Sequence, residues 1–149
     1  MSVYYYILIA ITVGIAGGLQ AIINSNLNKV ASLPLTTLVV NLVAFLTILP
    51  VYLFFSRQHF GVLREADWFA YLGGILGVVV VMGSTFLIPR TGVAIASSII
   101  IVSQLAFAMV ADHFGLFGIR EIPVSLAKIA GLGLMIAGIY LFFYRTPVS

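Results

Sequence analysis

Uncharged polar side chains interrupt several long apolar stretches of this sequence, and hydrogen bonding is the chemistry they can perform there. They are Gln20, Asn24, Asn41, Ser97 and Gln104. An amide or hydroxyl in hydrocarbon needs a hydrogen-bond partner, because an unpaired polar group there costs free energy. The partner is either a small neutral or zwitterionic solute or a polar group on another helix. The spacing alone leaves both alternatives open.

The composition indicates that lipid, not water, surrounds most of the chain. Of the 149 residues, 62% are hydrophobic and only 7% are charged, whereas soluble domains contain about 25% charged residues. The net charge of +3 is spread over the predicted loops, so we expect no nucleic-acid partner. The sequence has no cysteine, and His59 and His113 lie far apart. We therefore expect no metal site and no cofactor.

Five apolar stretches must position these polar residues, and each is long enough to cross a bilayer as a helix. They cover about residues 3–24, 35–56, 68–88, 92–112 and 123–144. No Lys or Arg precedes the first stretch, so we interpret it as a retained helix rather than a cleaved signal. The predicted fold is an all-α integral membrane protein with one five-helix transmembrane domain over residues 1–149.

Several residues predict local features of these helices. Pro50 should kink the second helix, because proline removes a helical hydrogen bond. Asp67 is a candidate N-cap for the third helix, and Pro123 is expected in the first turn of the fifth. Near the end of the third helix, we expect the hydroxyls of Ser84 and Thr85 to bond their own backbone.

Glycines at helical spacing predict close contacts between helices. Two pairs have the G-x-x-x-G spacing, and the fifth helix has small residues on more than one side. Such residues let another backbone approach closely. The expected packing glycines are Gly14, Gly18, Gly73, Gly77, Gly131 and Gly138.

Asp112 is the one acidic residue close to the polar part of a helix. It lies about 12 Å beyond Gln104 along the fourth helix, which places it near water. We interpret it as a solvated or loop-ordering acid, with a cation or proton site as the alternative. His113 follows it directly, but adjacent residues on a helix do not face each other. We therefore expect no enzyme activity.

Five crossings place the two termini on opposite sides of the membrane. Arg57, Arg64, Arg120 and Lys128 fall on the side of the N-terminus, and Lys29, Arg90 and Arg145 fall on the other side. Such a small difference specifies orientation weakly. Two oppositely inserted copies could therefore pair as an antiparallel dimer.

The same alternation places most polar residues in one half of the membrane. Gln20, Asn24, Asn41, Ser84, Ser97 and Ser98 fall in the half opposite the N-terminus, with Gln104 close to the midplane. An inverted copy would supply the mirror-image cluster. Two inverted halves around polar sites are the architecture of many secondary transporters.

Three segments of the sequence resemble the YdcZ-like membrane proteins: G-L-Q-A-I-I-N-S-N-L at 18–27, G-G-I-L-G at 73–77 and Q-L-A-F-A-M-V-A-D-H-F-G-L-F-G at 104–118. The small-residue helix after Pro123 fits as well. The resemblance implies the drug/metabolite transporter superfamily, whose full-length members have two inverted five-span halves. It also implies the inner membrane of a prokaryote. One departure is Ser103 before Gln104, where the family often has glycine.

These observations lead to a small-solute transporter that works as an inverted pair, with Gln20, Asn24, Asn41, Ser97 and Gln104 as substrate-binding residues. The second copy is either the same chain or a homologous subunit. Relatives that exchange protons for cations have a glutamate in the first helix, and this chain has none there. The alternative is a non-transporting membrane subunit or scaffold, whose amides and small residues serve assembly.

Overall fold

A computed structural model describes residues 3–56 and 58–144 of the chain. Its contacts divide the chain into two units, Met1–Pro89 and Arg90–Ser149. All regular elements in the described ranges are helical, which confirms the predicted all-α fold. Arg57 and Arg145, two of the basic residues used to predict orientation, lie outside the described residues.

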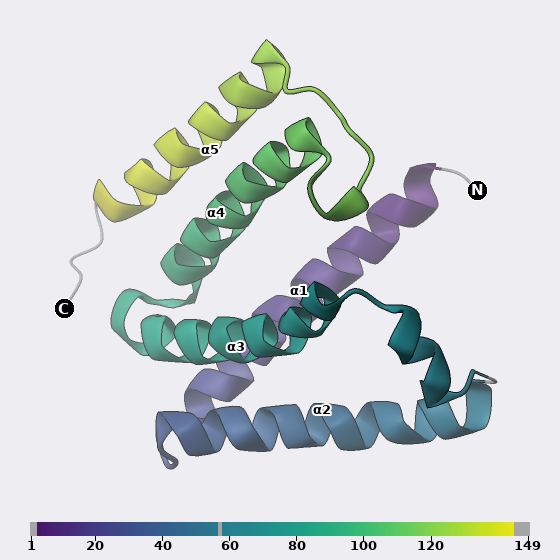
Figure 1. Ribbon diagram of the computed structural model, residues 1–149. Helices are drawn as coiled ribbons and strands as arrows, with labels where there is room; N and C mark the ends of the chain where they lie inside the picture. Colours follow the sequence, from purple (N-terminus) through teal and green to yellow (C-terminus); the bar gives the residue numbers. More distant parts are fainter. Residues whose placement is uncertain (1–2, 57, 145–149) are drawn as a thin grey trace. The chain divides into compact units, whose positions relative to one another are not determined.

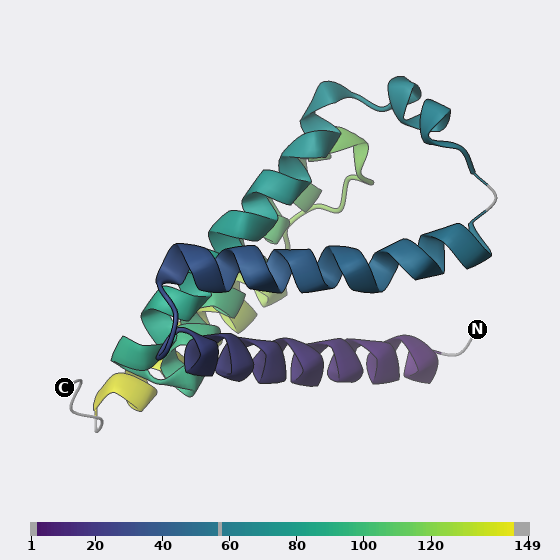
Figure 2. The same cartoon turned by 90° about the horizontal axis from the view of Figure 1, so that it is seen from below.

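The first unit contains α1 (Val3–Leu27), α2 (Leu33–Phe55), the 3-10 turns η1 (Phe60–Glu65) and η2 (Trp68–Tyr71), and α3 (Leu72–Thr91). A tight turn after Leu27 reverses the chain, and Ser32 stands before the first residue of α2. Helices α1 and α2 contact each other and meet at this turn (Figures 1 and 2). They therefore form a helical hairpin whose closed end is the turn.

The second unit contains α4 (Val93–Phe114), the 3-10 turn η3 (Leu116–Gly118) and α5 (Leu126–Tyr144). Helices α4 and α5 pack side by side along their length (Figure 1). Ser125 caps the start of α5, since its hydroxyl accepts a hydrogen bond from the backbone N–H of Lys128 at 3.3 Å.

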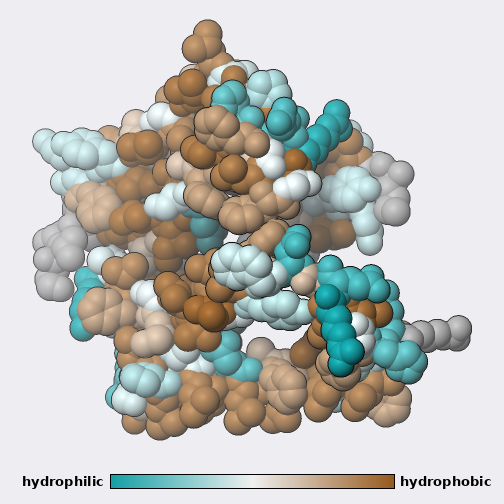
Figure 3. All heavy atoms as spheres, in the orientation of Figure 1, coloured by the Kyte–Doolittle hydropathy of each residue, from teal (hydrophilic) through white to brown (hydrophobic). Residues whose placement is uncertain are grey.

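Five helical segments are long and apolar enough to cross a membrane: Val3–Leu27, Leu33–Phe55, Trp68–Thr91, Val93–Phe114 and Leu126–Tyr144. Their large apolar side chains are mostly exposed in the single chain, as Leu38 (64%) and Leu134 (75%) illustrate. Figure 3 shows this apolar character across the visible surface. Lipid or another protein must cover these side chains, because water would not solvate them favourably.

The local predictions at the prolines and at Asp67 meet with mixed results. Helix α2 continues through Pro50 to Phe55, and α3 continues through Pro89 to Thr91. The prediction for Pro123 is wrong, because α5 begins only at Leu126. Asp67 does precede η2, but its side chain makes no capping hydrogen bond. The cap is the backbone carbonyl, which accepts the N–H of Ala70 at 3.0 Å.

Candidate functional site

Four buried polar side chains flank the turn between α1 and α2. Asn24 and Ser25 lie in the last turns of α1, with 5% and 7% of their surface exposed. Thr36 and Thr37 lie in the first turns of α2, with 0% and 5% exposed. We call these four residues the polar turn cluster. A chain surrounded by lipid thus buries hydrogen-bonding groups where a soluble hairpin would bury apolar ones.

Asn41 extends the polar turn cluster towards the middle of the membrane. It is half-buried, and its Nδ2 donates to the carbonyl of Thr37 at 2.8 Å. At 1.5 Å per residue, Asn41 lies about 12 Å along α2 from Leu33. The Oδ1 of Asn41 remains able to accept hydrogen bonds. A row of polar groups therefore runs from the turn to near mid-membrane depth.

Hydroxyls of the described helices differ in whether they bond their own backbone. Five of them donate to a carbonyl one turn earlier in the same helix, as Thr37 does to Leu33 at 3.0 Å. Ser84 follows this pattern with Val80 at 2.8 Å, as predicted. The prediction for Thr85 is wrong. Thr85 Oγ1 and Thr36 Oγ1 are fully buried and have no hydrogen-bond partner among the described residues.

The charged side chain nearest in sequence to the polar turn cluster is Lys29, in the turn that closes the hairpin. Lys29 lies exposed in the turn and donates from Nζ to Asn26 Oδ1 at 2.7 Å. None of the buried side chains in the described part of the chain is ionisable. The polar turn cluster can therefore bind through hydrogen bonds but offers no counter-charge to an ion.

The structure separates the predicted substrate-binding residues by exposure and by unit. In the first unit, Asn24 is buried, Asn41 is half-buried and Gln20 is exposed on α1. In the second unit, Ser97 is half-buried on α4 and Gln104 is exposed. Gln20, Asn24 and Asn41 thus lie on α1 and α2, which contact each other, and of these three only Gln20 is exposed.

The predicted packing glycines face open space within the chain. A Cβ atom built on any of the six would meet nothing within 4 Å: Gly14, Gly18, Gly73, Gly77, Gly131 and Gly138. Their role in helix packing therefore stays a prediction.

Asp112 lies in the last turn of α4 and is half-buried. Its backbone carbonyl accepts the N–H of Ile122 at 2.8 Å, which ties the connection between α4 and α5 to the helix end. The described residues contain no group of three or more side chains suited to a metal ion. An ion or proton site at Asp112 stays a prediction.

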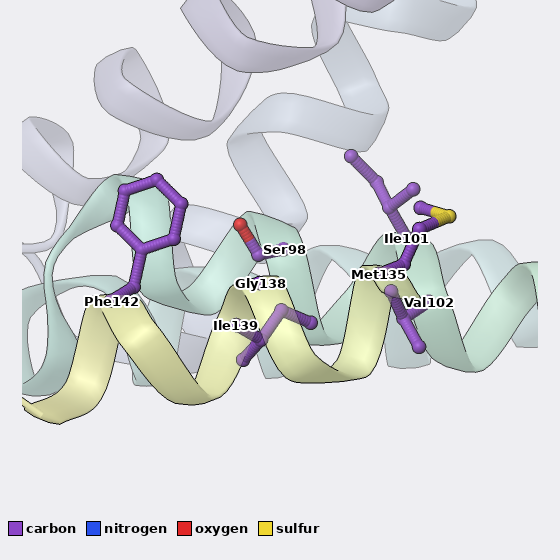
Figure 4. A pocket seen from close by; sticks show the side chains of 7 residues that line it. All are labelled: Ser98, Ile101, Val102, Met135, Gly138, Ile139 and Phe142. Carbon is purple, nitrogen blue, oxygen red and sulfur yellow. The ribbon is translucent and has the colours of Figure 1, made fainter. Parts of the chain in front are cut away.

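A hollow of about 210 Å³ lies between α4 and α5 (Figure 4). Its lining is almost entirely apolar: Ser98, Ile101, Val102, Met135, Gly138, Ile139 and Phe142. The hydroxyl of Ser98 already donates to the carbonyl of Ala94 at 2.7 Å. The hollow suits an apolar chain better than a polar solute.

Sequence reasoning missed Ser25, Thr36 and Thr37. The missed signal is their place beside the turn at residues 28–32, on the same side of the membrane as Asn24. Hydroxyls so near a helix end are easily interpreted as solvated. Their burial depends on how closely α1 and α2 approach, which residue types do not reveal.

Comparison with protein families identifies the chain. Residues 5–141 match the model of the DMT_YdcZ family, described as "Putative inner membrane exporter, YdcZ". The chain belongs to this family, which confirms the resemblance of its sequence segments. It is a multi-pass membrane protein of a transporter family, not of an enzyme family. No curated protein and no solved structure matches the chain.

Proposed function

We propose that the chain exports a small neutral or zwitterionic solute across the inner membrane of a prokaryote, and that two oppositely inserted copies form the working unit. This pair opens the solute path to one side of the membrane and then to the other. Asn24 and Asn41 bind the solute by hydrogen bonds, together with Gln20. Ser97 and Gln104 of α4 are further predicted contributors.

The observation that supports a solute path most strongly is the polar turn cluster. Asn24, Ser25, Thr36 and Thr37 are buried in a hairpin whose exposed side chains are mostly apolar. Polar side chains within membrane spans are costly, and they commonly mark the paths of solutes or ions. A path lined by amides and hydroxyls, without buried charge, fits a solute with no net charge.

Two features support an inverted pair. The basic residues are predicted to divide almost evenly between the two sides of the membrane. The positive-inside rule therefore favours neither orientation strongly. The glycines of the G-x-x-x-G pairs on α1 and α3 are open to an incoming backbone. A second copy of the chain is the partner that could always be present in the same membrane.

A scaffold function is the second candidate, and the exposure of Gln20 and Gln104 favours it. Neither amide has a hydrogen-bond partner within the described chain, and both lie on membrane-spanning helices. If these amides only join copies of the chain, replacing them would break the assembly. Such a result would say nothing about whether a solute path exists. The test must therefore detect a path independently of assembly.

Cysteine accessibility provides this test, because the natural sequence contains no cysteine. We expect the thiol of Asn41→Cys to react in intact membranes with 2-hydroxyethyl methanethiosulfonate, a neutral hydrophilic reagent. Only the thiolate reacts, and a thiol surrounded by hydrocarbon stays protonated. Reaction at this depth therefore requires water to reach Asn41.

Leu42→Cys is the matched control, since Leu42 follows Asn41 directly on α2 and its side chain is 52% exposed in the single chain. The proposal requires Asn41→Cys to react at least about tenfold faster than Leu42→Cys. Equal protection of both thiols in the membrane, with full reaction of both after unfolding in SDS, would leave the scaffold as the better interpretation.

A further inference from the structure

Thr36 is the one fully buried side chain of the polar turn cluster, and its hydroxyl is unsatisfied. None of its surface is exposed, and Thr36 Oγ1 has no hydrogen-bond partner in the described chain. A buried hydroxyl without a partner destabilises the fold, and an apolar side chain of the same shape would not. Some other interaction must therefore account for a hydroxyl at this position.

A local partner is within reach of Thr36 but is not used. Other helical hydroxyls donate to the carbonyl four residues earlier: Thr12, Thr37, Thr47, Ser84 and Ser98. For Thr36 that carbonyl belongs to Ser32, and it accepts only the backbone N–H of Thr36, at 2.9 Å. Threonine has two common rotamers in helices, one of which makes this bond. The hydroxyl of Thr36 is thus left available for a different partner.

The surroundings of Thr36 specify what kind of partner fits. The other members of the polar turn cluster are an amide and two hydroxyls, and none is ionisable. The nearest cation in sequence, Lys29, lies exposed in the turn and is bound to Asn26. An ion placed beside Thr36 would lose its hydration without gaining a counter-charge. An uncharged hydroxyl, amide or carbonyl group can instead both donate to and accept from Thr36.

We infer that the hydroxyl of Thr36 is an occluded hydrogen-bonding group of the solute path and that the solute group it binds is uncharged. This inference rests on the proposed transport function and narrows its substrate class to solutes that present an uncharged hydroxyl, amide or carbonyl group to Thr36. Thr36 is fully covered in this structure, which we interpret as the closed form of the path. Opening of the path exposes the hydroxyl to the solute.

Thr36→Cys tests the occlusion in the full-length chain inserted in membranes. A thiol that is always covered would not react, whereas a thiol in a path that opens reacts with 2-hydroxyethyl methanethiosulfonate. We expect nearly complete modification within the time that modifies Asn41→Cys. Thr36→Cys that stays unmodified in the membrane, yet reacts fully after unfolding in SDS, would overturn the inference.

The charge preference is tested on the same variant with three methanethiosulfonates that differ in their ethyl substituent: hydroxyl, sulfonate and trimethylammonium. Each rate is divided by the rate of that reagent with a free thiol in water. We expect the neutral reagent to be favoured at least about tenfold over both ions, which corresponds to about 1.4 kcal/mol. Equal normalised rates would overturn the assignment of an uncharged solute group.

Two further variants separate this inference from the transport proposal. Leu35→Cys, at nearly the same depth and 49% exposed, gives the reactivity of a thiol near the membrane surface outside the cluster. Reaction of Asn41→Cys without reaction of Thr36→Cys would keep the solute path and reject the role of Thr36. Protection of both thiols would instead reject the solute path itself.

Discussion

Thr36 and Thr37 are adjacent, buried side chains of the same type, but only one of them is hydrogen-bonded. The hydroxyl of Thr37 donates to the carbonyl of Leu33 at 3.0 Å, whereas Thr36 Oγ1 has no partner in the described chain. The two residues therefore form a natural matched pair. The same substitution at each should have opposite effects on stability.

Thr36→Val should stabilise the fold, and Thr37→Val should destabilise it. Valine keeps the β-branched shape, so only the hydroxyl is lost. At Thr36 the change removes an unsatisfied buried group and raises the free energy of unfolding by about 1 kcal/mol. At Thr37 it removes a hydrogen bond and lowers that free energy by about 1 kcal/mol.

Unfolding in detergent micelles titrated with SDS measures both changes, with the fluorescence of Trp68, the one tryptophan, as the signal. A loss of stability in Thr36→Val would mean that its hydroxyl is already bonded in the folded protein. The difference between Thr36 and Thr37 would then have no functional meaning.

The connection between α4 and α5 depends on Gly115. This residue has a positive φ of 59°, and a Cβ there would lie 2.8 Å from Glu121 Cγ and 3.2 Å from the carbonyl oxygen of Ile119. Gly118 also has a positive φ, of 77°, but a Cβ there would meet nothing within 4 Å. The two glycines thus separate backbone strain from steric overlap.

Gly115→Ala should therefore cost more stability than Gly118→Ala. Both variants pay about 1 kcal/mol for a left-handed backbone conformation, and overlap adds about 1 kcal/mol or more at Gly115. Thermal unfolding of the purified variants measures the difference. Equal melting temperatures would show that Glu121 moves aside without cost.

The open face of α1 predicts where a second copy of the chain packs. Gly14→Leu should leave the single chain folded, because nothing lies within 4 Å of its Cβ position. It should reduce pairing by roughly tenfold, since a bulky side chain keeps another backbone away. Val13→Leu adds bulk on the same helix and serves as the control, because Val13 is 65% exposed.

Resonance energy transfer between labelled copies in liposomes measures this pairing. Transfer that is unchanged by Gly14→Leu would place the interface elsewhere. The small residues of α3 or α5 would then be the next faces to examine.

Gln20→Leu and Gln104→Leu separate transport from assembly. Both side chains are exposed, so neither change should alter the fold of the single chain. If the amides line the solute path, each change should slow the modification of Asn41→Cys by roughly tenfold, because an apolar side chain disfavours water in the path. Energy transfer between copies should persist.

The opposite result, lost energy transfer with unchanged modification, would assign Gln20 and Gln104 to the contact between subunits. Membrane helices do associate through such amides. The polar turn cluster would then be the remaining candidate for the path.

The membrane spans could be predicted from sequence because lipid imposes a strong rule. A run of about 20 apolar residues must be helical there, since each backbone group needs an internal partner. The end of a span is less constrained, and α5 therefore begins three residues after Pro123 instead of including it. A proline near the end of a span could therefore lie in the first turn of the helix or in the loop before it.

The polar interior was harder to predict because residue type does not reveal burial. Gln20 and Thr36 are both polar and lie on the two helices that the same turn joins, yet Gln20 is exposed and Thr36 is fully buried. Their exposure depends on the direction in which each side chain points from its helix. It also depends on where α1 and α2 touch, which is a property of the hairpin and not of either residue.

The pairing of oppositely inserted copies is tested most directly by fusing reporters to the C-terminus. Alkaline phosphatase is active only outside the cytoplasm. Green fluorescent protein fluoresces only if it stays in the cytoplasm, because it does not fold correctly when it is exported unfolded. With five spans and weak orientation signals, both fusions should be active in comparable amounts. Activity of one fusion alone would fix a single orientation and contradict an antiparallel pair of identical chains.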